Sequence, residues 1–171
     1  MMHIAMFDAA NSIQRRYTPF LTDVQASSGA STEAAVAQAA HDVLVAMIPG
    51  DPPKAMLDAA LKAKLATLPP GRARQGVAIG KAAASRVLEW RANDGITAVG
   101  PPYVLPALPG LWQPAPGAAG LTQLPYATPF TMVSITQFAV PRFPELTSAR
   151  YTADFNEVKA IGKSDSATRD A

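Results

Sequence analysis

A proline-rich stretch at residues 99–147 decides how this chain is organised, and it contains GPPYVLPALPGLWQP (100–114), LPYATPF (124–130) and VPRFP (140–144). A connection of this length without regular structure is unusual inside a compact domain. A disordered linker would be polar and poor in aromatic residues. The aromatic residues of this stretch are Tyr103, Trp112, Tyr126, Phe130, Phe138 and Phe143. We therefore expect a long loop that lies against a larger scaffold.

The segments on both sides of this stretch have the apolar spacing of α-helices. Residues 1–13 carry apolar side chains on most sides, which is typical of a buried helix. Further helices are expected at residues 32–48, 54–68, 72–91 and 148–161. The clearest pattern lies in the segment 54–68, where four leucines recur at helical spacing. These leucines are Leu57, Leu61, Leu65 and Leu68.

Capping residues indicate where these helices begin and end, and small residues indicate how they pack. Ser31 is an expected N-cap, either Thr147 or Ser148 is expected to cap the last helix, and Gly162 stands where a C-terminal glycine belongs. Asn93, Asp94 and Gly95 are expected to end the fourth helix, because they tolerate positive φ. Within that helix, Gly80 and the alanines at 82–84 predict a smooth face that another helix can approach closely.

These observations predict an all-α fold, a portion of a helical bundle of about five helices with the proline-rich loop wrapping the scaffold. We expect an N-terminal helical bundle at residues 1–95, the irregular loop at 96–147, and a C-terminal helix with a polar tail at 148–171. Together they would form one incomplete domain.

Composition excludes some classes of function and leaves others open. The chain has 171 residues, 49% of them hydrophobic and 16% charged, with a net charge of +2. The absence of cysteine excludes disulfides, thiolate metal sites and a cysteine nucleophile. No apolar run approaches the roughly 18 residues of a membrane span, so none is expected. No signal peptide is visible, and localisation stays open.

Basic residues outnumber acidic ones across residues 54–91, where only Asp58 and Glu89 are acidic. We interpret them as the solvated faces of two helices rather than a nucleic-acid patch. Nucleic acid is therefore not an expected partner. The basic residues are Lys54, Lys62, Lys64, Arg72, Arg74, Lys81, Arg86 and Arg91.

The residues that could carry chemistry form no catalytic constellation. His3 and His41 lack the i, i+4 partner of a helical metal pair, and both are expected to be structural. His41 and Asp42 are adjacent, so we expect them to point to different sides of a helix and to form no dyad. The helix start at residues 70–74 has two arginines that could hold a phosphate, but a solvated turn is favoured. Asp154 and Glu157 are expected at the surface, and no nucleophile elbow, Walker A loop or dinucleotide fingerprint occurs.

Several segments, taken in order, resemble the N-terminal half of bacterial vanadium-dependent haloperoxidases, which belong with the type-2 phosphatidic acid phosphatases. The helical segments are HIAMFDAANSI (3–13), residues 34–44 ending in AAHDVL (39–44), LDAAL (57–61) and residues 151–162, with EVK at 157–159. YTPFL (17–21) resembles the segment that follows the family's first helix. The loop segments are PGLWQP (109–114), TPF (128–130) and QF (137–138). The resemblance covers nearly the whole chain.

The resemblance implies an all-α protein that uses peroxide to oxidise halide to a hypohalous species at bound vanadate. The family's oxyanion ligands are a lysine followed by Arg-Pro, a Pro-Ser-Gly-His and a Ser-Arg followed by a histidine. None of these motifs occurs here. Ser85-Arg86 does not match the last one, because no histidine follows it in the chain. The resemblance therefore assigns no catalytic, cofactor-binding or metal-binding residue, and the chain alone is expected to be inactive.

The resemblance also implies a partner for this scaffold. The helices from residue 32 to residue 91 would pack against a C-terminal catalytic half of the same protein, and a homo-oligomer stays open. Two alternatives remain. One is part of an acid phosphatase of the same superfamily, and the other is a non-enzymatic helical interaction module with proline and aromatic ligands in the long loop.

Overall fold

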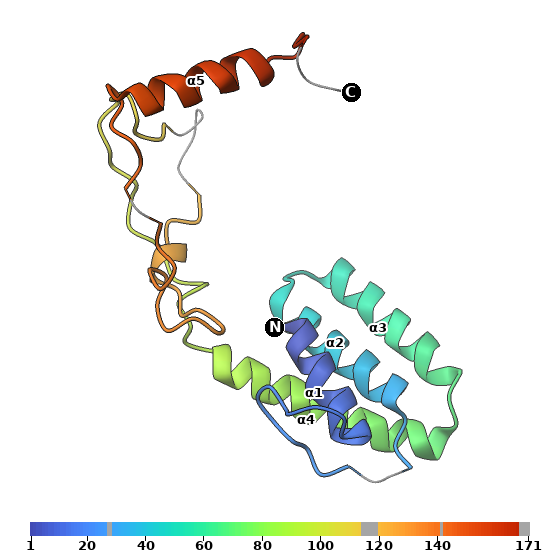
Figure 1. Ribbon diagram of the computed structural model, residues 1–171. Helices are drawn as coiled ribbons and strands as arrows, with labels where there is room; N and C mark the ends of the chain where they lie inside the picture. The colour runs from blue at the N-terminus through green and yellow to red at the C-terminus, as the bar shows by residue number, and fades with distance from the viewer. Residues whose placement is uncertain (27–28, 114–119, 141, 168–171) are drawn as a thin grey trace. The chain divides into compact units, whose positions relative to one another are not determined.

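A computed structural model describes residues 1–26, 29–113, 120–140 and 142–167 of the chain (Figure 1). The chain divides into two units, Met1–Asp94 and Gly95–Ala171, which are described separately. The first unit contains α1 (Met2–Gln14), α2 (Thr32–Met47), α3 (Asp51–Ala66) and α4 (Pro70–Arg91). The second contains the 3-10 helix η1 (Leu124–Tyr126) and α5 (Ala149–Ile161). The described residues form five α-helices and no strand, so the predicted all-α class is confirmed.

Small residues build the core of the first unit. The most extensive packing is between α2 and α4, and α1 lies against both (Figure 1). A Cβ added at Gly76 or Gly80 would stand 2.3 Å from the carbonyl oxygen of Ser31 or 2.4 Å from that of Ala35. Side chains larger than hydrogen would therefore push the two helices apart. The close approach predicted for the Gly80 face is confirmed.

The leucine row of α3 does not form the core. Leu57, Leu61, Leu65 and Leu68 are each only partly buried, and α3 has no buried residue. These leucines are only partly covered because α3 packs against α2 and makes few contacts with α4. A clear apolar stripe here marks a helix at the edge of the bundle.

Most expected helix ends are close to the observed ones. Ser31 accepts a hydrogen bond from the backbone N–H of Ala34 at 3.2 Å, and Ser148 accepts one from Tyr151 at 3.1 Å. Both α3 and α4 begin earlier than expected, because proline fits the first turn, where its missing N–H costs nothing. Gly162 caps α5 with a φ of −76°, so it does not use the left-handed conformation of a C-terminal glycine.

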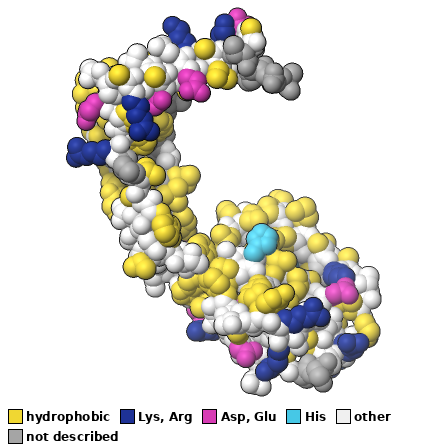
Figure 2. Space-filling model, in the orientation of Figure 1, with side chains coloured by type: hydrophobic (Ala, Val, Ile, Leu, Met, Phe, Trp, Pro, Cys, Tyr) yellow, Lys and Arg dark blue, Asp and Glu magenta, His cyan; other side chains and the backbone are white. Residues whose placement is uncertain are grey.

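The second unit is mostly irregular. Tyr103 and Trp112 close a small loop, with ring centroids 4.9 Å apart and the Tyr103 hydroxyl donating to the Trp112 carbonyl oxygen at 3.0 Å. Hydrophobic side chains gather at the surface of this stretch (Figure 2), and Val99 and Phe143 are 100% and 85% exposed. Pro114, Pro141 and the end of the polar tail, residues 168–171, lie outside the described residues. The wrapping of a scaffold by this loop and the three-part division of the chain stay predictions.

Across the part of the chain that the structure describes, no helix has the length and apolar character needed to cross a bilayer.

Candidate functional site

A histidine between two carboxylates links α2 to α3. The Nδ1 atom of His41 lies 2.8 Å from Oδ1 of Asp42, and its Nε2 atom lies 2.8 Å from Oδ1 of Asp58. The expectation that His41 and Asp42 point apart is therefore wrong. Consecutive helical residues do start about 100° apart around the axis, but the imidazole ring is long enough to reach back to its neighbour's carboxylate.

The two carboxylates differ in how firmly they are held. Asp42 shares the oxygen that contacts His41 with Gln38, whose buried side-chain amide donates to it at 2.7 Å. Both partners of Asp42 thus come from its own helix. Asp58 comes from α3, and its side chain is 54% exposed, whereas that of His41 is only 15% exposed. Asp58 therefore forms the part of the cluster that joins two helices.

The protonation of His41 follows from this geometry. A neutral imidazole has one N–H donor and one acceptor, whereas an imidazolium donates from both nitrogens. Partial burial acts to lower the pKa of His41, but hydrogen bonds to the Asp42 and Asp58 carboxylates outweigh it and raise the pKa above 6.5. Because a carboxylate faces each nitrogen, neither nitrogen is open to act as a general base, and the two contacts favour the protonated ring.

The cluster borders a small pocket between α2 and α3 of about 200 Å³. Lys64, at the same pocket, forms an ion pair with Glu33 of α2. Lys64 and, when it is protonated, His41 are therefore matched by three carboxylates. The apolar residues of the lining are Ala37, Ala40, Leu44, Leu57, Ala60 and Leu61.

The link from His41 to Asp58 was missed in the sequence, although a signal for it exists. Residues 48–50 form a short connection between α2 and α3, which is typical of an antiparallel helix pair. Residues at equal distances from such a connection lie opposite each other. His41 and Asp58 satisfy this condition within one residue, and so do Glu33 and Lys64.

A second buried polar cluster lies on α1. The buried carboxylate of Asp8 accepts hydrogen bonds from the backbone N–H groups of Phe20, Leu21 and Thr22 at 2.8, 2.9 and 3.0 Å. Ser12 accepts one from Val24 at 3.0 Å. The buried face of α1 is therefore partly polar, and it holds the segment that follows the helix rather than a ligand.

The two arginines at the start of α4 do not form a phosphate site. Arg72 donates from Nε to the Gly29 carbonyl oxygen at 3.0 Å and accepts at its own carbonyl from the N–H of Ser31, also at 3.0 Å. Arg74 is exposed. The adjacent pocket includes Glu33, whose charge disfavours an anion. Arg72 thus fastens the loop before α2.

The other candidate residues lie apart. His3 is exposed on α1. Ser85 and Arg86 both hydrogen bond to Glu89, at 2.8 and 3.1 Å, and these bonds lower the pKa of Glu89. Asp154 faces Arg150 at 3.9 Å on the exposed α5. The described residues include no group of three or more side chains suited to hold a metal ion.

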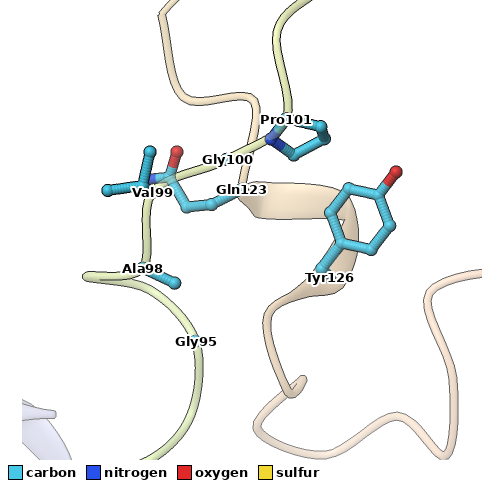
Figure 3. Close-up of a pocket in the computed structure, with 7 residues that line it drawn as sticks. All are labelled: Gly95, Ala98, Val99, Gly100, Pro101, Gln123 and Tyr126. Carbon is cyan, nitrogen blue, oxygen red and sulfur yellow. The ribbon is translucent and has the colours of Figure 1, made fainter.

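The second unit has a pocket of its own (Figure 3), with a volume of about 450 Å³. One wall is the segment that carries Val99 and Pro101, and the other is the turn that carries Gln123 and Tyr126. Gln123 donates to the carbonyl oxygen of Ile96 at 3.0 Å, so its amide fixes the turn. The pocket is an open apolar groove without a charged side chain.

Fold and site together define an all-α protein with an Ala- and Gly-rich helical bundle. Comparison with known proteins adds no family, because no family model, no curated protein and no solved structure matches the chain.

The described residues do not fit vanadate. An oxyanion is held by positive donors that are free to face it. His41 and Lys64 line one pocket, but carboxylates already occupy both of them. The remaining histidine is exposed on α1. No step of a reaction can therefore be assigned to these residues.

Proposed function

We propose that this chain is the N-terminal scaffold part of a vanadium-dependent haloperoxidase-like protein. In this proposal the Ala- and Gly-rich bundle supports a catalytic half that supplies the oxyanion ligands. The reaction, peroxide-driven oxidation of halide to a hypohalous species, would belong to the whole protein. This chain would contribute shape and a packing surface.

The observation that carries the proposal is the contrast between the packed first unit and the bare apolar surface of the second. α5 has no buried residue, and Phe155 and Val158 are exposed on it. Monomeric proteins rarely expose large contiguous apolar patches, and such patches mark contact surfaces. A catalytic half would provide the missing contact, and the ordered series of resembling segments says which kind of half to expect.

Two activity assays on the natural gene product test the proposal. We expect bromination of phenol red that requires peroxide, bromide and added orthovanadate. We expect none from the purified 171-residue chain, since the oxyanion-ligand motifs of the resembling family do not occur in its sequence. The substitution Arg86→Lys in the natural gene product is a control and should leave bromination unchanged, because Arg86 forms an ion pair with Glu89 on the surface of α4.

The outcomes separate the alternatives. Hydrolysis of p-nitrophenyl phosphate without bromination would favour a phosphatase of the same superfamily. Neither activity in the natural product would contradict the proposal and favour a non-enzymatic interaction module. Vanadate-dependent bromination by the 171-residue chain itself would contradict the scaffold role.

A further inference from the structure

We propose that His41 is a pH-dependent latch that holds α3 against α2 while the imidazole is protonated and releases it when the ring becomes neutral. The inference is independent of the proposed function, because it concerns how one helix of the bundle is attached. It rests on two observations, the position of His41 between carboxylates from two helices and the shallow packing of α3.

The geometry requires a charged ring. Both ring nitrogens lie 2.8 Å from carboxylate oxygens. Only an imidazolium can donate to both, because a neutral ring would turn a lone pair toward one carboxylate. Loss of the proton therefore breaks one of the two contacts.

The contact that breaks is the one to Asp58. Asp42 lies on the same helix as His41 and is also held by the amide of Gln38. Asp58 is more than half exposed, so water can take the place of the imidazole. A neutral ring therefore keeps its proton on Nδ1 and stays bonded to Asp42. The contact between His41 of α2 and Asp58 of α3 is lost, and the contact between His41 and Asp42 within α2 remains.

Little else holds α3 in place. It has no buried residue, and its leucines are only partly covered. Among the described residues it also forms an ion pair through Lys64 with Glu33, and these side chains are 44% and 63% exposed. Local opening of such a helix costs less than global unfolding. Opening would uncover the apolar lining of the pocket between α2 and α3.

Among the described residues, two charged groups act on His41. Asp42 on α2 and Asp58 on α3 are the charges that act on it, and Lys64 at the same pocket is paired with Glu33. Two buried charged groups on the other packed helices have partners of their own. In α1, Asp8 binds backbone N–H groups, and at the end of α4, Arg91 is paired with Asp94.

The sign of the pH effect follows. The folded-state pKa of His41 is raised above its ordinary value of 6.5. The stabilising contribution of the latch is therefore fully present below pH 6.5 and is lost as the pH rises through the folded-state pKa. We expect α3 to be fastened in mild acid and loosened in mild alkali.

Hydrogen exchange of the full chain between pH 5 and 9 tests the latch, with each rate corrected for the intrinsic pH dependence of exchange. We expect amide protection in α3 to fall by up to about tenfold as His41 loses its proton, while α4 does not change. His41→Gln should remove this pH dependence, because glutamine does not titrate. His3→Gln is the matched control on exposed α1 and should behave as the parent chain.

Asp58→Asn provides a second variant at an exposed position, where misfolding is not expected. It should lower the pKa of His41 in an NMR titration and make the protection of α3 independent of pH. Protection of α3 that does not change with pH in the parent chain would overturn the latch. So would the same pH dependence in His41→Gln.

Discussion

Replacement of Gly80 by alanine tests whether backbone contact between α2 and α4 holds the bundle together. The new Cβ would lie 2.4 Å from the carbonyl oxygen of Ala35, 2.8 Å from the Cβ of Gln38 and 3.0 Å from the N of Ala39. Ordinary contact begins at 3.4 Å. The helices must therefore separate locally by about 1 Å, and neither backbone can rotate away as a long side chain could.

The magnitude follows from two opposing effects. Overpacking of a tight core costs about 1–3 kcal/mol, whereas alanine gains roughly 0.8–1.0 kcal/mol over glycine in helix propensity. Since the contacted atoms belong mainly to the backbone, we expect the upper part of the first range and a net loss of about 1–2 kcal/mol. For a unit of 94 residues, each kcal/mol lowers Tm by roughly 4–8 °C.

The assay is urea unfolding of the full chain, followed by circular dichroism at 222 nm. Gly71→Ala is the matched control, because it lies on the same helix and its Cβ would meet nothing within 4 Å. We expect Gly71→Ala to unfold at the same or a higher urea concentration than the parent chain, with a free energy of unfolding that is higher by up to about 1 kcal/mol. If Gly80→Ala is as stable as Gly71→Ala, the close-contact argument is wrong.

Three further substitutions should lower the free energy of unfolding by amounts that the same urea assay can rank. Asp8→Asn should cost about 2–3 kcal/mol, because an amide group would face backbone N–H donors that a carboxylate now accepts. Arg91→Met should cost roughly 3–5 kcal/mol, since it removes the guanidinium that forms an ion pair with the buried carboxylate of Asp94 at 2.7 Å. Ser31→Ala should cost about 1 kcal/mol through loss of the α2 cap. Equal losses for Ser31→Ala and Arg91→Met would contradict this ranking.

The helices could be predicted from the sequence because their signals are local. Apolar spacing and N-cap residues act within one or two turns, so the sequence predicts the five helices, the cap Ser31 and, as one of two neighbouring candidates, the cap Ser148. Their depth in the fold could not be predicted in the same way. The strong leucine row belongs to the edge helix α3, whereas the weakly patterned α4 lies in the core. Burial depends on which helices pair, and pairing is not a local property.

The candidate site shows the same limit. The sequence identifies His41 as a candidate because of its residue type. Its partner Asp58 is 17 positions away and can be predicted only from the register of the α2–α3 pair. Asp8 was also visible in the sequence. Its role depends on the path of residues 20–22 across α1, which no periodicity encodes. The proposed reaction rests on resemblance, and none of the described residues supplies its chemistry.

The small size of the core residues has a thermal consequence. Of the twelve buried apolar residues that the structure describes, nine are alanine, so close backbone approach replaces large buried side chains. The heat capacity of unfolding scales with the apolar surface that becomes exposed, at about 12–15 cal/mol/K per residue in ordinary proteins. This bundle should fall below that range. Its free energy of unfolding would then vary little between refrigeration and body temperature, and cooling would weaken it less than it weakens a domain built on leucine and phenylalanine.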